Sequence, residues 1–261
     1  MRLVFLGSGS AYTVGGDNFQ SNMLLLAPEG QRLLIDCGSD IRWSLPRQGL
    51  SYLDITDIYV SHLHSDHVGG LESIGFQRKF DPRCSRPRLY VEASLADPLW
   101  DHCLQGGMGV ISGGKTTLET FFEVRRVNRH EPFEWDGVHL EAVPTIHVAA
   151  ANASAASYGL LIESGNHHSF ITTDTQFTPD HLAPYYARAD LIFHDCETGP
   201  AKTGIHAHYD DLCRLPDSVR AKTWLYDYQP GPLPDAVADG FRGFVQAGQS
   251  FELSSSKSPK A

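Results

Sequence analysis

The chain has 261 residues, of which 31 are acidic and 21 basic, which gives a formal net charge of −10. This charge argues against a long polyanion as the natural partner, because long nucleic acids are bound through clustered cations, so any nucleic-acid substrate should be small. Apolar segments recur as far as Val245 without a linker-like break, which predicts a single domain over residues 1–253 and a disordered polar tail over residues 254–261.

The cysteines and the hydropathy of the chain indicate the cellular compartment in which the protein is found. The five cysteines are widely spaced and form no CxxC pair, which favours a reduced, cytoplasmic compartment. No apolar run approaches the length that spans a membrane, and the apolar residues after Met1 are interrupted too soon for a signal peptide. We therefore expect a soluble protein with no membrane partner.

Strands and turns alternate at the start of the chain. Residues 2–6 have the apolar content of a buried strand, and the Gly-Ser-rich segment after them is more typical of a tight turn than of a phosphate-binding loop. Residues 23–26 and 32–36 bracket Pro-Glu-Gly, the pattern of a β-hairpin. Asp36 ends this hairpin, where it either supports a metal-binding histidine or caps a turn. A short helix is predicted over residues 41–48.

The segment from Val60 to Leu71, VSHLHSDHVGGL, packs four metal-capable side chains into six residues, namely His62, His64, Asp66 and His67. An extended chain puts the first two histidines on one face, so that both can bind one ion. Asp66 and His67 follow where the chain must turn before two glycines, and they can reach a second ion. The sequence therefore predicts a binuclear metal site here.

Two segments beyond this motif could contact a substrate. A helix is predicted over residues 71–80, and basic residues are concentrated between Gln77 and Arg88: Arg78, Lys79, Arg83, Arg86 and Arg88. They either attract phosphate or another anion, or form a solvated face. Residues 104–114 are dense in glycine, which is typical of a mobile lid near a site, with disorder that serves no function as the alternative.

Later strand ends carry further groups that handle metals or protons. These are His147, Asp174, Asp195 and Asp227, each at or just after an apolar, strand-like run. His147 supplies a ligand that a tetrahedral ion at His62 and His64 still lacks, and a carboxylate at 174 can bridge two ions. His206 and His208 lie in GIHAHYDDL. A layered α/β fold brings such strand ends to one site.

These motifs resemble the metallo-β-lactamase superfamily, through HLHSDH followed by His147 and Asp174. The resemblance implies a single-domain α/β fold, a four-layer αββα sandwich with a dinuclear metal site at one edge. FLGSGSA with NFQSN, and HDCET followed by GIHAHY, resemble the ribonuclease Z branch. That branch has a Glu-His pair thought to protonate the leaving group. Asp195 and His206 occupy the matching places, although a buried hydrogen-bonded pair with no catalytic part is the alternative, and His208 is a lesser candidate for the acid.

The chain is most similar, within this branch, to small dimeric cyclic-nucleotide phosphodiesterases of the anti-Pycsar type, through GGM, GIHAHYDDL, KTWLYDYQPG and DGFRGFV. The resemblance implies hydrolysis of 3′,5′-cyclic mononucleotides, cCMP and cUMP first and cAMP and cGMP next, in evasion of anti-phage signalling. It also implies a homodimer and two divalent ions, with Zn²⁺ favoured.

The resemblance further implies a role for each site residue. His62, His64 and His147 would hold the first ion. The second would be held by Asp66, His67 and Asp227, with Asp174 bridging. The catalytic residues would be Asp66, Asp195 and His206, where Asp195 orients His206 to protonate the departing sugar oxygen.

One residue departs from the family pattern. The family ordinarily has a histidine in the LxH segment where Asp227 stands here. An aspartate would favour Mn²⁺ or Mg²⁺ over Zn²⁺ at the second position, or the second position is weakened, naturally or by an engineered substitution. Two other functions stay open. A ribonuclease Z-like endonuclease for transfer RNA 3′ processing would use the same chemistry, and a nucleotide-binding module would result if Asp227 impairs the second metal site.

Overall fold

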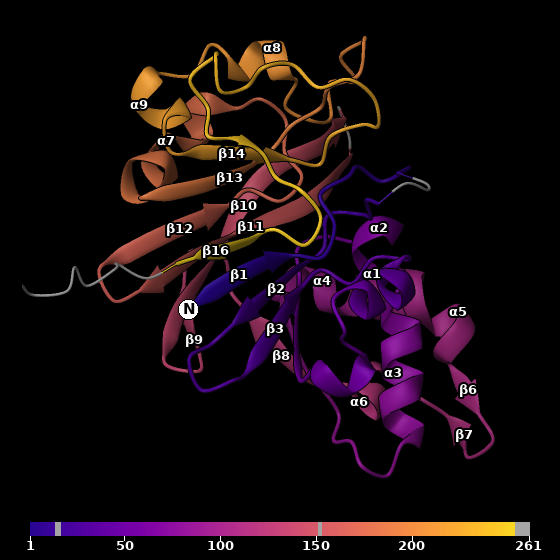
Figure 1. Cartoon of the computed structure of the whole chain (residues 1–261). Helices are drawn as coiled ribbons and strands as arrows, with labels where there is room; N and C mark the ends of the chain where they lie inside the picture. Colours follow the sequence, from indigo (N-terminus) through magenta and orange to yellow (C-terminus); the bar gives the residue numbers. More distant parts are fainter. Residues whose placement is uncertain (14–16, 151–152, 254–261) are drawn as a thin grey trace, which may run out of the picture.

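Two seven-stranded sheets form the centre of the molecule in a computed structural model that describes residues 1–13, 17–150 and 153–253 (Figure 1). The tail predicted over residues 254–261 lies outside this range. The order of the first sheet is β16 (Ser250–Glu252), β1 (Arg2–Phe5), β2 (Met23–Leu26), β3 (Arg32–Ile35), β4 (Asp57–Val60), β5 (Arg88–Glu92) and β8 (Glu123–Val127). The order of the second is β15 (Gly243–Phe244), β14 (Thr223–Tyr226), β13 (Leu191–Asp195), β12 (His167–Ile171), β11 (Ala153–Ser164), β10 (Val138–Ala150) and β9 (Pro132–Trp135).

Short helices lie against both sheets (Figure 1). Those of the first half are α1 (Ile41–Arg47), η1 (Tyr52–Asp54), α2 (Ser65–Val68), α3 (Leu71–Phe80), α4 (Ala93–Pro98), the π-helical turn η2 (Leu99–Leu104), α5 (Gln105–Met108) and α6 (Leu118–Phe121). Those beside the second sheet are α7 (Pro179–Arg188), α8 (Tyr209–Leu212) and α9 (Asp217–Arg220). The predicted four-layer αββα arrangement is confirmed.

The core lies between the sheets because strand side chains alternate between their two faces. Phe5 of the first sheet contacts Phe193 and Tyr226 of the second, with ring centroids 5.3 and 5.4 Å apart. The neighbour of Phe193 on β13, Ile192, points the other way and packs in a second apolar cluster with Leu182 of α7. The two faces of β13 thus join the central core to the outer helix layer.

Several local predictions are confirmed. β2 and β3 form the expected antiparallel hairpin, and α3 spans the predicted residues 71–80. The Gly-Ser-rich segment contains the expected turn, in which the main-chain nitrogen of Thr13 donates to the main-chain oxygen of Ser10 at 3.0 Å. Gly7 lets the chain pass close to Gln20, because a side chain there would meet the main-chain oxygen of Gln20 at 2.3 Å. Within the described residues, no helix is long and apolar enough to cross a membrane.

The glycine-dense segment over residues 104–114 is regular structure rather than an irregular loop. It forms α5 and one strand of a small hairpin made by β6 (Val110–Ile111) and β7 (Gly114–Lys115). Met108 is fully buried, and a side chain at Gly75 would meet its terminal carbon at 2.8 Å. The apolar residue therefore anchors the segment in the core, and a lid role stays a prediction.

Candidate metal centre

The predicted metal-binding side chains come together at the carboxyl ends of strands from both sheets. β4 leads into His62 and His64, and α2 carries Asp66 and His67. β10 carries His147, while Asp174 follows β12 and Asp227 follows β14. The strands β3 to β5 run parallel, as do β12 to β15. Parallel strands end at one edge of a sheet, so residues distant in the chain meet there.

Three histidines and one carboxylate form the first group. One ligand atom from each of His62, His64, His147 and Asp174 lies within 4.8 Å of the others. Nδ1 of His64 is 3.1 Å from Nε2 of His62 and 3.2 Å from Nε2 of His147. Burial lowers the pKa of His62 and of His147, so both rings are neutral. Lone pairs of neutral rings that converge in this way fit a shared cation.

Asp66, His67 and Asp174 form the second group. Nε2 of His67 lies 3.0 Å from Oδ2 of Asp66 and 3.3 Å from Oδ1 of Asp174. Both Nε2 of His67 and Oδ1 of Asp174 are buried without a hydrogen-bond partner among the described residues. Buried polar atoms are rarely left unpaired, so the donor set fits a divalent ion at this second position.

The charge of the site also fits cations. Five carboxylates are at most 7% exposed, namely Asp36, Asp66, Asp174, Asp195 and Asp227. Burial acts to lower the pKa of His67, but the carboxylates of Asp174, Asp66 and Asp36 raise it well above the ordinary value. So many buried acidic groups repel one another unless positive charge lies between them.

Asp36 supports a histidine rather than capping a turn. Its Oδ2 accepts a hydrogen bond of 2.8 Å from Nδ1 of His67 and one of 2.7 Å from the hydroxyl of Ser61. Its Oδ1 accepts from the main-chain nitrogen of Ser61 at 2.8 Å. This contact settles the alternative left open by the sequence and leaves Nε2 of His67 free to bind an ion.

Asp227 lies at the other end of the site. It groups with Asp174 and His206, and the close group of Asp66 and His67 does not include it. Its Oδ1 accepts a 2.6 Å hydrogen bond from the hydroxyl of Ser21. Its Oδ2 is buried without a partner among the described residues, 3.6 Å from Nδ1 of His206. Its place as the third protein ligand of the second ion, beside Asp66 and His67, therefore stays a prediction.

Asp195 and His206 form the expected hydrogen-bonded pair. Nδ1 of His206 donates to Oδ2 of Asp195 at 2.9 Å, and the main-chain nitrogen of Thr175 donates to the same oxygen at 2.8 Å. Burial raises the pKa of Asp195 to about 6, so the carboxylate is ionised at neutral pH. Burial acts to lower the pKa of His206, but the carboxylates of Asp195, Asp174 and Asp227 raise it to about 11. The imidazole is 15% exposed and carries a proton that it can donate.

His208, the lesser candidate for the acid, belongs to the loop structure instead. Its Nε2 donates to the main-chain oxygen of Gly199 at 3.0 Å, and its Nδ1 accepts from the main-chain nitrogen of Asp210 at 3.2 Å. His208 thus caps the start of α8. Both ring nitrogens are engaged, which leaves none for a substrate.

Two of the five basic residues between Gln77 and Arg88 have structural partners, which argues against a phosphate site at these two positions. Arg78 is buried and donates to the main-chain oxygens of Tyr52 and Leu53. Arg88 pairs with the fully buried Asp57. These guanidinium groups satisfy buried acceptors and are not free to bind a substrate anion.

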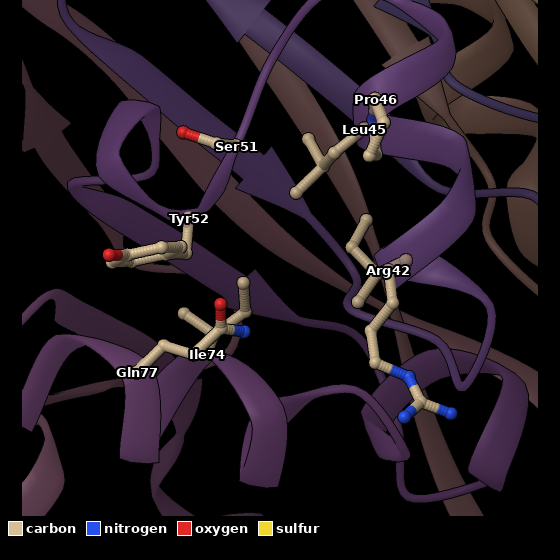
Figure 2. A pocket seen from close by; sticks show the side chains of 8 residues that line it. Arg42, Leu45, Pro46, Ser51, Tyr52, Ile74 and Gln77 are labelled. Atoms are coloured by element: carbon tan, nitrogen blue, oxygen red, sulfur yellow. The ribbon is translucent and has the colours of Figure 1, made fainter.

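A hollow of about 220 Å³ lies between α1, η1 and α3 (Figure 2). Leu45, Tyr52, Ile74 and Gln77 line it, with Arg42 at one side. None of the predicted site residues lines it, so this hollow is separate from the candidate metal centre.

Three residues that support the site were not predicted from the sequence. Ser21 holds Asp227, while Thr145 and Ser157 both donate to the main-chain oxygen of Asp174, at 3.0 and 3.1 Å. Serine and threonine are common in every kind of segment, and no spacing rule identified them. Their contacts span up to 206 residues of sequence, so only the fold reveals them.

Solved structures share this fold. The chain is similar to the metallo-beta-lactamase fold protein YhfI from Bacillus subtilis, with a TM-score of 0.74 and 16% identity over 96% of this chain and 99% of that one. It is equally similar to a new diphosphatase from the PhnP family, with a TM-score of 0.74 and 22% identity over 97% and 98%. Human tRNase Z, short form, gives a TM-score of 0.69 and 17% identity over 97% and 100%.

The fold and the buried cluster of histidines and carboxylates define a metal-dependent hydrolase of the metallo-β-lactamase fold. The family model described as anti-Pycsar protein Apyc1 matches residues 1–251, so the chain belongs to the anti-Pycsar Apyc1 family. An anti-Pycsar protein Apyc1 from Paenibacillus harenae is 35% identical over 87% of this chain and 90% of its own length. Another, from Bacillus phage 010DV004, is 28% identical over 97% and 98%.

Proposed function

We propose that the protein hydrolyses 3′,5′-cyclic mononucleotides to nucleoside monophosphates, with cCMP and cUMP as the first candidates and cAMP and cGMP next. The observation that carries this proposal is the Asp195–His206 pair. Nδ1 of His206 lies 4.0 Å from Oδ2 of Asp174, the carboxylate at the centre of the metal-binding groups. An acid at that place suits a reaction whose leaving group is a sugar oxygen. Family membership favours the same substrate class, and evasion of anti-phage signalling as its purpose.

The ligand assignment follows from the groups of side chains. His62, His64 and His147 would hold a first ion and Asp66 with His67 a second, while Asp174, which belongs to every group, would bridge them. Zn²⁺ suits the imidazole-rich first position, and the carboxylates of the second also suit Mn²⁺ or Mg²⁺. Ions bound there would supply positive charge to the phosphoryl oxygens and would lower the pKa of water.

The chain's own residues provide the rest of the chemistry. The oxygen of a water molecule attacks phosphorus, the bond from phosphorus to one of the two ester oxygens of the sugar breaks, and the proton that the water loses passes to solvent. His206 gives its proton to that departing oxygen. Before the transfer, Asp195 stabilises the imidazolium and fixes the orientation of the ring through its hydrogen bond to Nδ1. Asp66, which lies beside His67, would help to hold the second ion and to orient the attacking water. The result is a nucleoside monophosphate, whose added charge cations held by the metal-binding groups would offset.

We also propose a cytoplasmic homodimer. The reduced, widely spaced cysteines suit the cytoplasm, and the described cysteines form no disulfide. The dimer rests on family resemblance, and a closing motion of residues 104–114 rests on the glycine density of that segment. Light scattering of the purified chain would test the proposed dimer, because a dimer has twice the mass of the monomer.

A substrate panel tests the proposed function. The purified full-length chain, loaded with Zn²⁺ or Mn²⁺, is incubated with the four 3′,5′-cyclic mononucleotides and with precursor transfer RNA. We expect ring opening of cyclic mononucleotides, and loss of it in the His206→Gln variant. Cleavage of precursor transfer RNA with no ring opening would overturn the proposal. Nucleotide binding without turnover, in protein that holds its metal, would instead identify a binding module.

A further inference from the structure

The backbone is strained at the residue before Asp174. Thr173 has φ of 51°, in the left-handed region, and its side chain is 1% exposed. A β-branched residue is a genuine outlier there, because its side chain crowds the main chain. Such strain persists only where the surroundings hold it in place, and it is concentrated at functional sites.

Two hydroxyls from neighbouring strands hold the next residue. Thr145 of β10 and Ser157 of β11 are direct partners across the strand pair. Both donate to the main-chain oxygen of Asp174, at 3.0 and 3.1 Å, and both are nearly fully buried. A single carbonyl oxygen thus accepts two buried hydroxyl hydrogen bonds, which fixes the peptide between Asp174 and Thr175, directly after the strained Thr173.

The direction of Asp174 decides the geometry of the whole centre. It is the one residue that belongs to all three metal-capable groups of the described chain. Its Oδ2 lies 3.6 Å from Nε2 of His62 and 3.5 Å from Nε2 of His147, while Oδ1 lies 3.3 Å from Nε2 of His67. A rotation of the backbone at Thr173 would swing this carboxylate out of all three groups at once.

We propose that Thr145 and Ser157 are positioning residues that hold Asp174 in its bridging direction against the strained backbone of Thr173. The inference rests on the proposed function only in taking Asp174 as a metal ligand. Without the two hydroxyls, Thr173 relaxes to an ordinary negative φ and the carboxylate turns away. A glycine at 173 would adopt the left-handed backbone without this cost, so it would remove the need for the hydroxyls.

The test measures metal binding rather than turnover. Chelator-treated, full-length protein is titrated with Co²⁺ and followed by visible absorbance, and Zn²⁺ per chain is counted after refilling. The variants are the double change Thr145→Val with Ser157→Ala, the same pair with Thr173→Gly added, and Thr173→Gly alone. Ser169→Ala is the matched control, since Ser169 is fully buried on β12 and its hydroxyl has no partner among the described residues.

We expect the double variant to bind Co²⁺ at least tenfold more weakly than the unchanged protein, because groups that orient metal ligands typically change affinity by roughly 10- to 100-fold. Adding Thr173→Gly to the double variant should restore most of the affinity. Thr173→Gly alone should bind Co²⁺ as the unchanged protein does and should raise the melting temperature of the metal-free chain. The control should bind as the unchanged protein does.

Unchanged Co²⁺ affinity in the double variant, with only its melting temperature lowered, would show that the hydroxyls serve stability alone and would overturn the inference. If the double variant binds Co²⁺ more weakly and Thr173→Gly does not restore the affinity, the hydroxyls do not act against backbone strain at Thr173, and that part of the inference is overturned. If the double variant does not fold, Thr145→Val and Ser157→Ala are tested singly, each with and without Thr173→Gly. No nucleotide is present, so failure of the chain to open cyclic nucleotides leaves this result standing.

Discussion

Nδ1 of His147 lies 2.8 Å from the main-chain oxygen of Ile205. A carbonyl oxygen only accepts, so Nδ1 carries the proton and the lone pair of Nε2 is directed to His64 and Asp174. Ile205 precedes His206 in the same loop. One contact therefore sets the tautomer of a proposed metal ligand and fixes the loop that carries the proposed acid.

His147→Asn should remove metal while the fold survives. The asparagine amide can still donate to the Ile205 oxygen, but it offers no nitrogen in the place of Nε2. We expect less Zn²⁺ per chain, measured by mass spectrometry, and at least about 100-fold lower turnover, in line with loss of a charge-stabilising group. His181→Asn is the control, since His181 also contacts a main-chain oxygen, that of Pro144, outside the metal groups. Full Zn²⁺ content in His147→Asn would show that His147 is not a ligand.

Asp36→Asn should weaken metal binding through His67. The substituted amide retains only one of the two carboxylate oxygens that accept from His67 and Ser61. We expect roughly 10- to 100-fold lower affinity for the second ion and a loss of stability of about 1–3 kcal/mol, measured by Co²⁺ titration and urea unfolding. Asp190→Asn is the control, because Asp190 lies near histidines on the surface, where its side chain is 53% exposed. Equal effects of the two changes would argue against a supporting part for Asp36.

His206→Gln should slow the reaction only where the leaving group needs a proton. We expect kcat for a cyclic nucleotide to fall by roughly 10² to 10⁴, with unchanged Zn²⁺ content. A nitrophenyl phosphodiester releases a stable anion, so its hydrolysis should fall far less. Asp195→Asn should act in the same direction, because it removes the charge that keeps His206 protonated. Equal loss on both substrates would show that His206 does not act as the acid.

Asp227→His should change metal preference more than maximal activity, if Asp227 is a competent ligand. A nitrogen in place of the carboxylate oxygen favours Zn²⁺ over Mn²⁺, and histidine tolerates the left-handed backbone at this position, where φ is 67°. The ratio of activities with the two metals is the measurement. Ser21→Ala, which removes the hydrogen bond to Oδ1, is the companion change. A large gain of activity with both metals would instead mean that Asp227 weakens the second position.

Stability should depend on pH through His194. Its Nε2 accepts from the Tyr186 hydroxyl at 2.7 Å, its Nδ1 donates to the Asp195 main-chain oxygen at 2.7 Å, and burial lowers its pKa from 6.5 to about 4. Between those values the unfolded chain binds a proton that the folded chain does not, so stability falls as pH falls, by up to about 3 kcal/mol. The His194→Gln variant should lose this part of the pH dependence in urea unfolding. His139→Gln, on the exposed side of β10, should retain it.

The amino-acid sequence by itself determined the local half of the centre. In HLHSDH the ligands are neighbours, so the alternation of an extended chain and the turn into α2 are enough to bring His62, His64, Asp66 and His67 together. The same short-range physics predicted the β2–β3 hairpin and α3. Strand ends near Asp174 and Asp195 were also recognisable, because apolar runs stop there, whereas β10 continues past His147 to Ala150.

Tertiary structure alone decided the contacts between distant segments. Several features depend on which strands are adjacent. They are the neighbours of Asp227, the support that Asp36 gives to His67, the structural contacts of Arg78 and Arg88, and the two hydroxyls that donate to Asp174. Pairing of that kind is set by burial over the whole core, and no local pattern encodes it. The strain at Thr173 is of the same origin, since a local preference for ordinary φ is overruled by contacts from β10 and β11.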